Sequence, residues 1–155
     1  MVTTNQNVMP PSSSTASAGQ IQNPEKLNQF SYGEGSEKIL QAALKHGTGG
    51  DGKHCYTGVA KAVKESTGLQ LTGLSAYMGA DQLAKSDKFK EVKVDKKDLP
   101  SLPAGAIVVW DKGAGHPHGH ISIADGKGNE YSDIKRKQIT NYGTSVRVFL
   151  PTQQA

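Results

Sequence analysis

The pattern of hydrophobic and polar residues divides the chain into a polar N-terminal segment, a part with helical spacing and a C-terminal part with strand spacing. Residues 1–31 are rich in Ser, Thr, Asn, Gln and Pro and contain almost nothing to bury. Such a segment cannot offset the conformational entropy that it would lose on ordering. We therefore expect a disordered leader or linker over residues 1–31, followed by one domain over residues 32–155.

Helical spacing predicts three helices ahead of the strands. The first covers residues 37–46, which carry a short apolar stripe and precede a cluster of glycines. The second begins at Cys55 and ends near Ser66, where Gly68 supplies the residue that commonly stops a helix. The third covers residues 76–85.

Strand spacing dominates the rest of the chain. Residues 106–110 form a continuous apolar run rich in β-branched side chains, which is typical of a buried strand. Residues 120–124 and 145–150 alternate between polar and apolar, residues 89–94 alternate weakly and carry lysines that suit a sheet edge, and residues 134–142 show no clear pattern. Helices followed by a small antiparallel sheet indicate an α+β fold.

A glycine-rich turn predicts a hairpin between the strand at 120–124 and the segment that ends at Asp133. If residues 126–127 form a two-residue turn, His120 lies opposite Asp133, with Cβ atoms about 4.5–5.5 Å apart on one face. A turn one residue earlier would place Tyr131 opposite His120, and a three-residue loop would place Ser132 there. The first register brings an imidazole and a carboxylate together.

Composition and charge narrow the function classes. The formal charge of +4 suits a polyanionic partner such as a cell wall, yet the lysines are interleaved with acids, as over residues 93–98. Without a basic cluster that contains aromatic residues, nucleic-acid binding is not predicted. The sequence has neither an apolar run of about 20 residues for a membrane span nor the pattern of a signal peptide at its start. We therefore expect that other machinery delivers any protein of this kind to a target outside the cytoplasm.

The single cysteine, Cys55, excludes an internal disulfide and a site with several cysteines. In the first turn of a helix, a thiol is exposed to the positive end of the helix dipole, which favours the thiolate. The glycines ahead of it allow a substrate to approach, and N–H groups at the helix start can stabilise an oxyanion. Cys55 is therefore a candidate nucleophile, and the alternative is an inert buried thiol.

Three histidines, His116, His118 and His120, alternate with Pro and Gly in a short loop. This spacing allows a zinc site with Cys55 as the fourth ligand, but a loop is a poor frame for catalytic zinc, and we predict no metal. His120 alone enters a strand and is the candidate base. Asp133 is the candidate that orients its ring, as the third member of a triad does. The acids Asp125 and Glu130 are expected to be solvated.

The order of these motifs resembles the papain-like peptidoglycan amidases and endopeptidases of the CHAP (cysteine, histidine-dependent amidohydrolase/peptidase) and NlpC type. The resemblance covers roughly residues 36–150. The matching pieces are Cys55 opening a helix with Val59-Ala60 after it, the strand LPAGAIVVWD (102–111), the stretch GHISIADGKG (119–128) and YSDI (131–134).

This resemblance implies a papain-like domain with Cys55 as nucleophile, His120 as general base and acid, and Asp133 as orienting residue. The sequence departs from the family at two points. CHAP members more often carry Glu or Asn, and NlpC members His, at the third position. The aromatic residue typical after the helix start is replaced by Thr57-Gly58. The candidates for substrate contacts are Tyr56, His118 and Trp110.

The function predicted in this way is a cell-wall hydrolase that cleaves an amide bond in the peptide portion of peptidoglycan through an acyl-enzyme, without a metal or organic cofactor. It would act at the cell wall or in the periplasm, as a phage lysin or a secreted antibacterial effector. Its partners would be peptidoglycan, a secretion or virion carrier and, for an effector, an immunity protein. The alternatives are a deamidase or protease toxin acting on a host protein, and a zinc-binding or non-catalytic module.

Overall fold

A computed structural model describes residues 34–46, 50 and 54–152, with side chains from residue 38 onward. The leader predicted for residues 1–31 lies outside this range. The helical elements are α2 (Glu34–His46), α3 (Cys55–Thr67), the 3-10 turn η1 (Ala76–Met78), α4 (Gly79–Lys85) and the 3-10 turn η2 (Lys96–Ser101). The strands are β1 (Phe89–Val92), β2 (Ile107–Trp110), β3 (His120–Ala124), β4 (Asn129–Tyr131), β5 (Lys135–Lys137) and β6 (Val146–Pro151).

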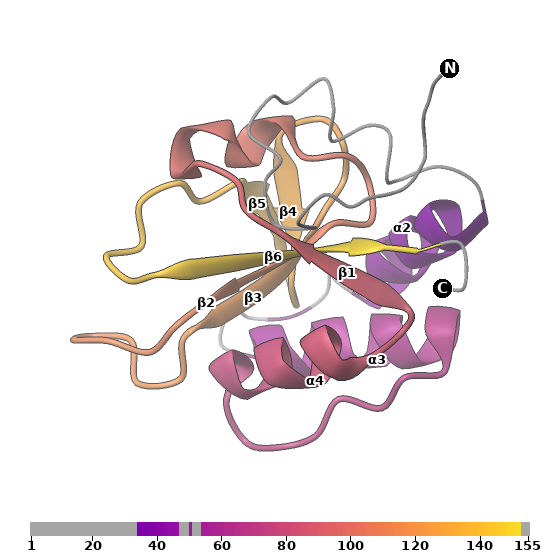
Figure 1. The fold of residues 1–155 in the computed structure, drawn as a ribbon, viewed down its shortest axis with the longest axis horizontal. Coiled ribbons are helices and arrows are strands. Elements are labelled where there is room, and N and C mark those ends of the chain that lie inside the picture. The colour runs from indigo at the N-terminus through magenta and orange to yellow at the C-terminus, as the bar shows by residue number, and fades with distance from the viewer. Residues whose placement is uncertain (1–33, 47–49, 51–53, 153–155) are drawn as a thin grey trace.

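The strands form one six-stranded antiparallel sheet in the order β1-β6-β2-β3-β4-β5, and helices α3 and α4 run along one side of it (Figure 1). The last strand, β6, lies between β1 and β2, so the C-terminal strand is an interior strand of the sheet. Helices packed on an antiparallel sheet confirm the predicted α+β class.

The predicted helix boundaries agree closely with the structure. Helix α3 begins at Cys55, and Gly68 ends it with a left-handed backbone (φ 83°) and an N–H that bonds to the Lys64 carbonyl at 2.9 Å. The predicted third helix is present, but its first turn is the tighter η1, followed by α4. The pattern of apolar residues was therefore a sufficient guide to this half of the fold.

A hydrophobic core fills the space between the sheet and the three helices. Ile121 and Ile123 face this side from β3, where they meet buried residues of the helices such as Val59 and Leu83. Fully burying an aliphatic side chain of this size stabilises a fold by about 1.5–3 kcal/mol. This packing sets the height of α3 above the sheet.

A second core lies on the opposite face of the sheet, where η2 and the segment before β6 cover it. Trp110 and Leu99 are buried there, and Tyr142 packs against the edge of the cluster. Along β3, the residues that face this side alternate with those that face the helices. His120 therefore projects toward this second core, beside its strand partner Trp110.

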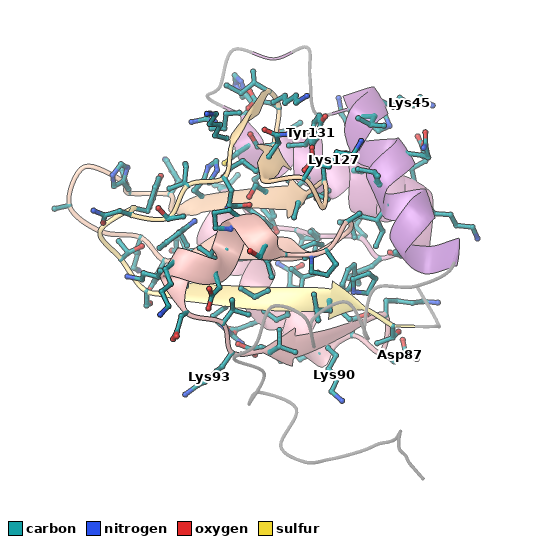
Figure 2. All side chains as sticks on the ribbon, turned by 90° about the horizontal axis from the view of Figure 1, so that it is seen from above. Lys45, Asp87, Lys90, Lys93, Lys127 and Tyr131 are labelled. Carbon is teal, nitrogen blue, oxygen red and sulfur yellow. The ribbon has the colours of Figure 1, made fainter. Side chains whose placement is uncertain are left out.

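The prediction of a lysine-bearing edge strand is confirmed by β1, which pairs only with β6 in the sheet. Lys90 and Lys93 project outward from this edge (Figure 2). Charged side chains on an edge strand oppose pairing with a second sheet. In the described part of the chain, no helix is both long and apolar enough to cross a membrane.

The β3–β4 hairpin has a register that none of the three predicted turns gives. Ala124 pairs with Glu130, and the Asp125 N–H bonds to the Asn129 carbonyl at 3.1 Å, so the turn holds residues 126–128. Gly126 and Gly128 both have positive φ, which lets the chain reverse over three residues. The predicted pairing of His120 with Asp133 is therefore wrong, because β4 ends at Tyr131, before it could reach His120.

Beyond the end of β4, the chain packs against the N-terminal turn of α3. Gly58 in this turn packs so closely that a Cβ atom would overlap the Ser132 carbonyl oxygen and lie 3.1 Å from the Asp133 Cα. The His54 N–H, just ahead of the helix, bonds to the Asp133 carboxylate at 3.0 Å. The sequence thus brings Cys55 against the hairpin through a glycine that permits close approach and an acid that holds the helix start.

We predict that Gly58→Ala destabilises the protein by about 1–3 kcal/mol, although alanine is the better helix former by about 1 kcal/mol. The added methyl group would push α3 away from Ser132, whose colliding atoms belong to the backbone and cannot rotate aside. Urea unfolding followed by circular dichroism measures the change. Thr57→Ala, at an exposed position in the same turn, is the matched control and should be neutral or slightly stabilising. Equal stability of Gly58→Ala and wild type would contradict the contact.

Candidate active site

Cys55 is the first residue of α3 and is only partly buried. The first N–H groups of a helix have no acceptor within the helix, and they carry the positive end of its dipole. No acidic side chain lies in the first turn of α3, although the Asp133 carboxylate accepts the His54 N–H just ahead of it. The remaining N–H groups of this turn can stabilise an oxyanion formed beside the sulfur.

His120, the first residue of β3, contacts both Cys55 and Glu130. Its Nε2 lies 2.5 Å from the Glu130 Oε2, and its ring lies close enough to the Cys55 side chain to interact with it. Because Nε2 faces the carboxylate, we expect Nδ1 to be the ring nitrogen nearer the thiol. The imidazole thus connects a thiol at a helix start to a buried acid, although the two come from residues 75 positions apart.

Glu130 is fully buried, with 0% of its surface exposed, so the prediction of a solvated side chain is wrong. Its Oε1 accepts hydrogen bonds from the Gln138 side-chain amide at 3.1 Å and from the Ile139 N–H at 3.0 Å. Its Oε2 faces His120. A buried carboxylate is costly unless donors surround it, and here both oxygens have donors.

The register explains how Glu130 reaches His120. Glu130 pairs with Ala124, and residues 120, 122 and 124 of β3 project on the same face of the sheet. Between Ala124 and His120 on that face lies Ser122, whose side chain is small. The long glutamate can therefore lean along the strand over Ser122 and meet the imidazole.

Burial on its own disfavours the charged imidazole, but hydrogen bonds to Cys55 and Glu130, together with the negative charges of both, raise the pKa of His120 to about 9. At neutral pH the ring is therefore an imidazolium between two acidic partners. Such a ring stabilises a thiolate and holds a proton that it can pass to a leaving group.

Asp133 holds the start of α3 and does not occupy the position predicted for it behind His120. Its carboxylate accepts the His54 N–H at 3.0 Å, and its carbonyl accepts the Gly50 N–H at 2.7 Å. A Cβ atom on Gly50 would lie 2.5 Å from the Asp133 carboxylate, so this contact also depends on a glycine. The acid that contacts His120 is Glu130, and Asp133 contacts the start of the helix that carries Cys55.

One signal in the sequence pointed to Glu130. The resemblance to CHAP members favours glutamate at the third position, and Glu130 is the glutamate of this hairpin. The sequence did not predict the contact of Glu130 with His120, because the hairpin register depends on a three-residue turn. In this turn the Asp125 carboxylate accepts the N–H groups of Lys127 at 2.7 Å and Asn129 at 3.1 Å. Asp125 thus stabilises the turn and is buried, contrary to the prediction of a solvated acid.

The three candidates for substrate contacts lie in different surroundings. Trp110 is fully buried in the second core, which contradicts a role in contacting substrate. Tyr56 is half-buried, and its hydroxyl donates to the Thr72 carbonyl at 2.6 Å, so it ties α3 to the following loop. His118 is exposed, with its Nδ1 2.6 Å from the Ser75 hydroxyl, and remains a candidate.

The three closely spaced histidines make different contacts, although His116 and His120 both stack on Tyr142. His118 contacts Ser75, His120 contacts Glu130, and the ring of His116 stacks on Tyr142 with centroids 4.0 Å apart. Among the residues that the structure describes, no three His, Cys, Asp or Glu side chains gather in a way that could hold a metal ion.

A shallow groove of about 620 Å³ lies beside the start of α3. It is lined by Lys45, His46, Gly50, His54, Thr57, Gly58, Lys61 and Asp133. The lysines give its rim a positive charge. Asp133 therefore lines this groove, whereas Glu130 contacts His120.

No model of a protein family matches the sequence, and no curated protein sequence does either. The structure is similar to the Tae3 effector in two crystal structures of the type VI effector–immunity complex Tae3–Tai3 from Ralstonia pickettii. The native complex matches with a TM-score of 0.55 and 20% sequence identity over 76% of this chain and 98% of that chain. The selenomethionine complex matches with a TM-score of 0.56 and 23% identity over 72% of this chain and 97% of that chain.

At this level of identity the similarity shows the fold and nothing finer. The resemblance to CHAP and NlpC enzymes, which rests on short motifs, therefore stays a prediction. The chain has the papain-like α+β fold that the sequence predicted.

Proposed function

We propose that this protein is a cysteine-dependent hydrolase that cleaves an amide bond in the peptide portion of peptidoglycan, and that it serves as an antibacterial effector of a type VI secretion machinery. The observation that carries the proposal is the arrangement of Cys55, His120 and Glu130. A thiol at a helix start, an imidazole in contact with it and a buried acid behind the imidazole form the constellation of a cysteine nucleophile with its base.

The chemistry follows from the geometry of these three residues. The thiolate of Cys55 attacks the amide carbonyl carbon, and the N–H groups at the start of α3 stabilise the oxyanion. The His120 imidazolium gives its proton to the leaving amine, which departs and leaves a thioester. His120 then takes a proton from water, whose oxygen attacks the thioester and releases the carboxylic acid and the thiol.

Glu130 serves this cycle by holding the imidazole in one tautomer. Its carboxylate accepts the Nε2–H, which leaves Nδ1 to exchange the proton with Cys55 and with the leaving group. The donors Gln138 and Ile139 in turn fix the carboxylate. No step of this cycle needs a metal or an organic cofactor.

Two lines of support point to the cell wall as the target. The sequence motifs resemble peptidoglycan amidases and endopeptidases, and the fold is that of an effector found in complex with an immunity protein. The same fold similarity favours a secreted effector over a phage lysin. We infer that a cognate immunity protein binds this chain and that the protein acts in the periplasm of the target cell.

We predict that Cys55→Ala lowers the release of soluble fragments from purified sacculi by at least about 10³-fold, because the nucleophile is lost. The fold should persist, since the side chain is small and half-buried. Chromatography of the released fragments measures the rate, and Lys64→Ala, at an exposed position further along α3, is a control that should keep full activity. If wild type releases no fragments while its Cys55 thiol is reactive, wall hydrolysis is wrong and a host protein amide becomes the substrate to test.

We predict that Glu130→Gln lowers the turnover rate by about 10²–10⁴-fold. The amide oxygen must stay toward the two N–H donors, Gln138 and Ile139, so the amide NH₂ would face the His120 Nε2. The ring proton would then move to Nδ1, where it blocks proton transfer from Cys55.

Asp133→Asn is the matched control for this substitution, and it should lower the rate by less than about tenfold, because an amide oxygen can still accept the His54 N–H. Proton–nitrogen NMR of His120 reports the tautomer directly. A larger loss in Asp133→Asn than in Glu130→Gln would restore the triad that the sequence predicted.

We predict an alkaline limit of activity near pH 9, where His120 loses the proton that it must give to the leaving amine. The charge and hydrogen bond of Glu130 help to raise the pKa of His120. In Glu130→Gln this pKa falls, so the residual activity should decline at a lower pH than in wild type. The pH dependence of kcat/KM on a soluble muropeptide, from about pH 5 to about pH 10, measures both limits. Identical alkaline limits in the two proteins would show that another group sets them.

A further inference from the structure

Tyr142 lies against the His120 ring and has no part in the proton transfers. It belongs to the segment between β5 and β6, and its ring centroid is 5.6 Å from that of His120 with an interplanar angle of 28°. The same ring stacks on His116 at 4.0 Å and contacts Trp110 at 5.6 Å. Tyr142 is therefore fixed by aromatic neighbours in a place where it covers the candidate base.

The hydroxyl of Tyr142 also holds the backbone next to His120. It donates a hydrogen bond to the Gly119 carbonyl at 3.1 Å. Gly119 has a positive φ of 68°, and a Cβ atom there would overlap the Trp110 carbonyl oxygen. The residue before His120 thus sits in a tight, unusual conformation, and Tyr142 ties it from the side of the second core.

The hydrogen bond to Glu130 and the contact with Cys55 are made at the edge of the imidazole, and neither of them supports a face of the ring. Stacking of a second aromatic ring supports a face of the imidazole, and such a pair stabilises the fold by about 0.5–1.5 kcal/mol beyond the contribution of the buried area. Tyr142 supplies this contact to His120.

The charges around Tyr142 keep its hydroxyl protonated. Burial raises the pKa of the phenol, and the negative charges of Cys55 and Glu130 raise it further against the opposing effect of Arg136. The hydroxyl therefore remains a donor to Gly119 throughout the range in which the site would work.

We propose that Tyr142 is a positioning residue that holds the His120 imidazole in the plane shared by Cys55 and Glu130. This role rests on the proposed function, in which His120 must exchange a proton with the thiol and with the leaving amine. The ring of Tyr142 supports the imidazole, and its hydroxyl anchors the peptide that precedes it.

The test compares Tyr142→Leu, which loses the ring and the hydroxyl, with Tyr142→Phe, which keeps the ring. Tyr77→Leu is the matched control, because Tyr77 is also half-buried and its ring contacts Lys112. Tyr77 meets the backbone of residues 118–119 through its own N–H and Cβ, which leucine keeps. The first measurement is the rate of Cys55 alkylation by iodoacetamide at about pH 6 and about pH 9.5. An isolated thiol with a pKa of about 8.5 is scarcely ionised at the lower pH, so the rate there reports the support that a placed imidazolium gives to the thiolate.

We expect Tyr142→Leu to lower the alkylation rate at the lower pH by roughly tenfold, with the rate at the higher pH changed by less than about twofold. Tyr142→Phe should recover most of the loss, and Tyr77→Leu should match wild type. On soluble muropeptides, Tyr142→Leu should lower kcat with little change in KM. Thermal unfolding of each variant shows that the comparison is made on folded protein.

Two outcomes would overturn the proposal. One is an unchanged ratio of the two alkylation rates in Tyr142→Leu. The other is a rise in KM alone, which would make Tyr142 a residue that contacts substrate. Alkylation needs no peptidoglycan, so the expected ratio in a protein that does not degrade sacculi would support the role of Tyr142 while rejecting the proposed substrate.

Discussion

The candidate site depends on the close contact between the first turn of α3 and the chain that leaves β4. Gly58 permits this contact by leaving room for the Ser132 carbonyl, and the Asp133 carboxylate holds the His54 N–H ahead of the helix. Hydrophobic burial fixes how high α3 lies above the sheet, but it does not fix how far the helix slides along it. The polar contact at the helix start fixes that position, and with it the meeting of Cys55 and His120.

A second constraint is electrostatic. Glu130 is a carboxylate without solvent contact, which no protein tolerates unless donors or a positive charge surround it. Two donors on one oxygen and the imidazole on the other meet this need, and the interactions of His120 with Cys55 and Glu130 raise its pKa to about 9 against the effect of burial. The carboxylate that must be paired because it is buried is therefore also one of the two groups that keep the imidazole charged.

The sequence predicted most of the helices and the central strands, because each depends on local spacing or on a strong residue preference. The sequence did not predict which acid contacts His120. The partner of His120 is set by a hairpin register, and one extra residue in a turn changes every cross-strand pair. Here the turn of residues 126–128 places Glu130, not Asp133, on the side of the imidazole. Residues 134–142 gave no clear pattern, although residues 135–137 form β5. Residues 138–142 are held by aromatic stacking and by single hydrogen bonds rather than by a periodic face, and Tyr142 was missed for that reason.

The site combines contributions from both faces of the sheet. Cys55 packs beside the core under the helices, whereas His120 projects toward the second core with Trp110 and Tyr142. We infer that the two meet at the start of β3, where β4 does not pair with it, because the β3–β4 pairing covers only Ile123 and Ala124. The distance between the Cys55 sulfur and the His120 ring therefore depends on two hydrophobic cores that pack separately. A change of packing in either core moves one partner and not the other, which makes this separation sensitive to substitutions far from the reacting atoms.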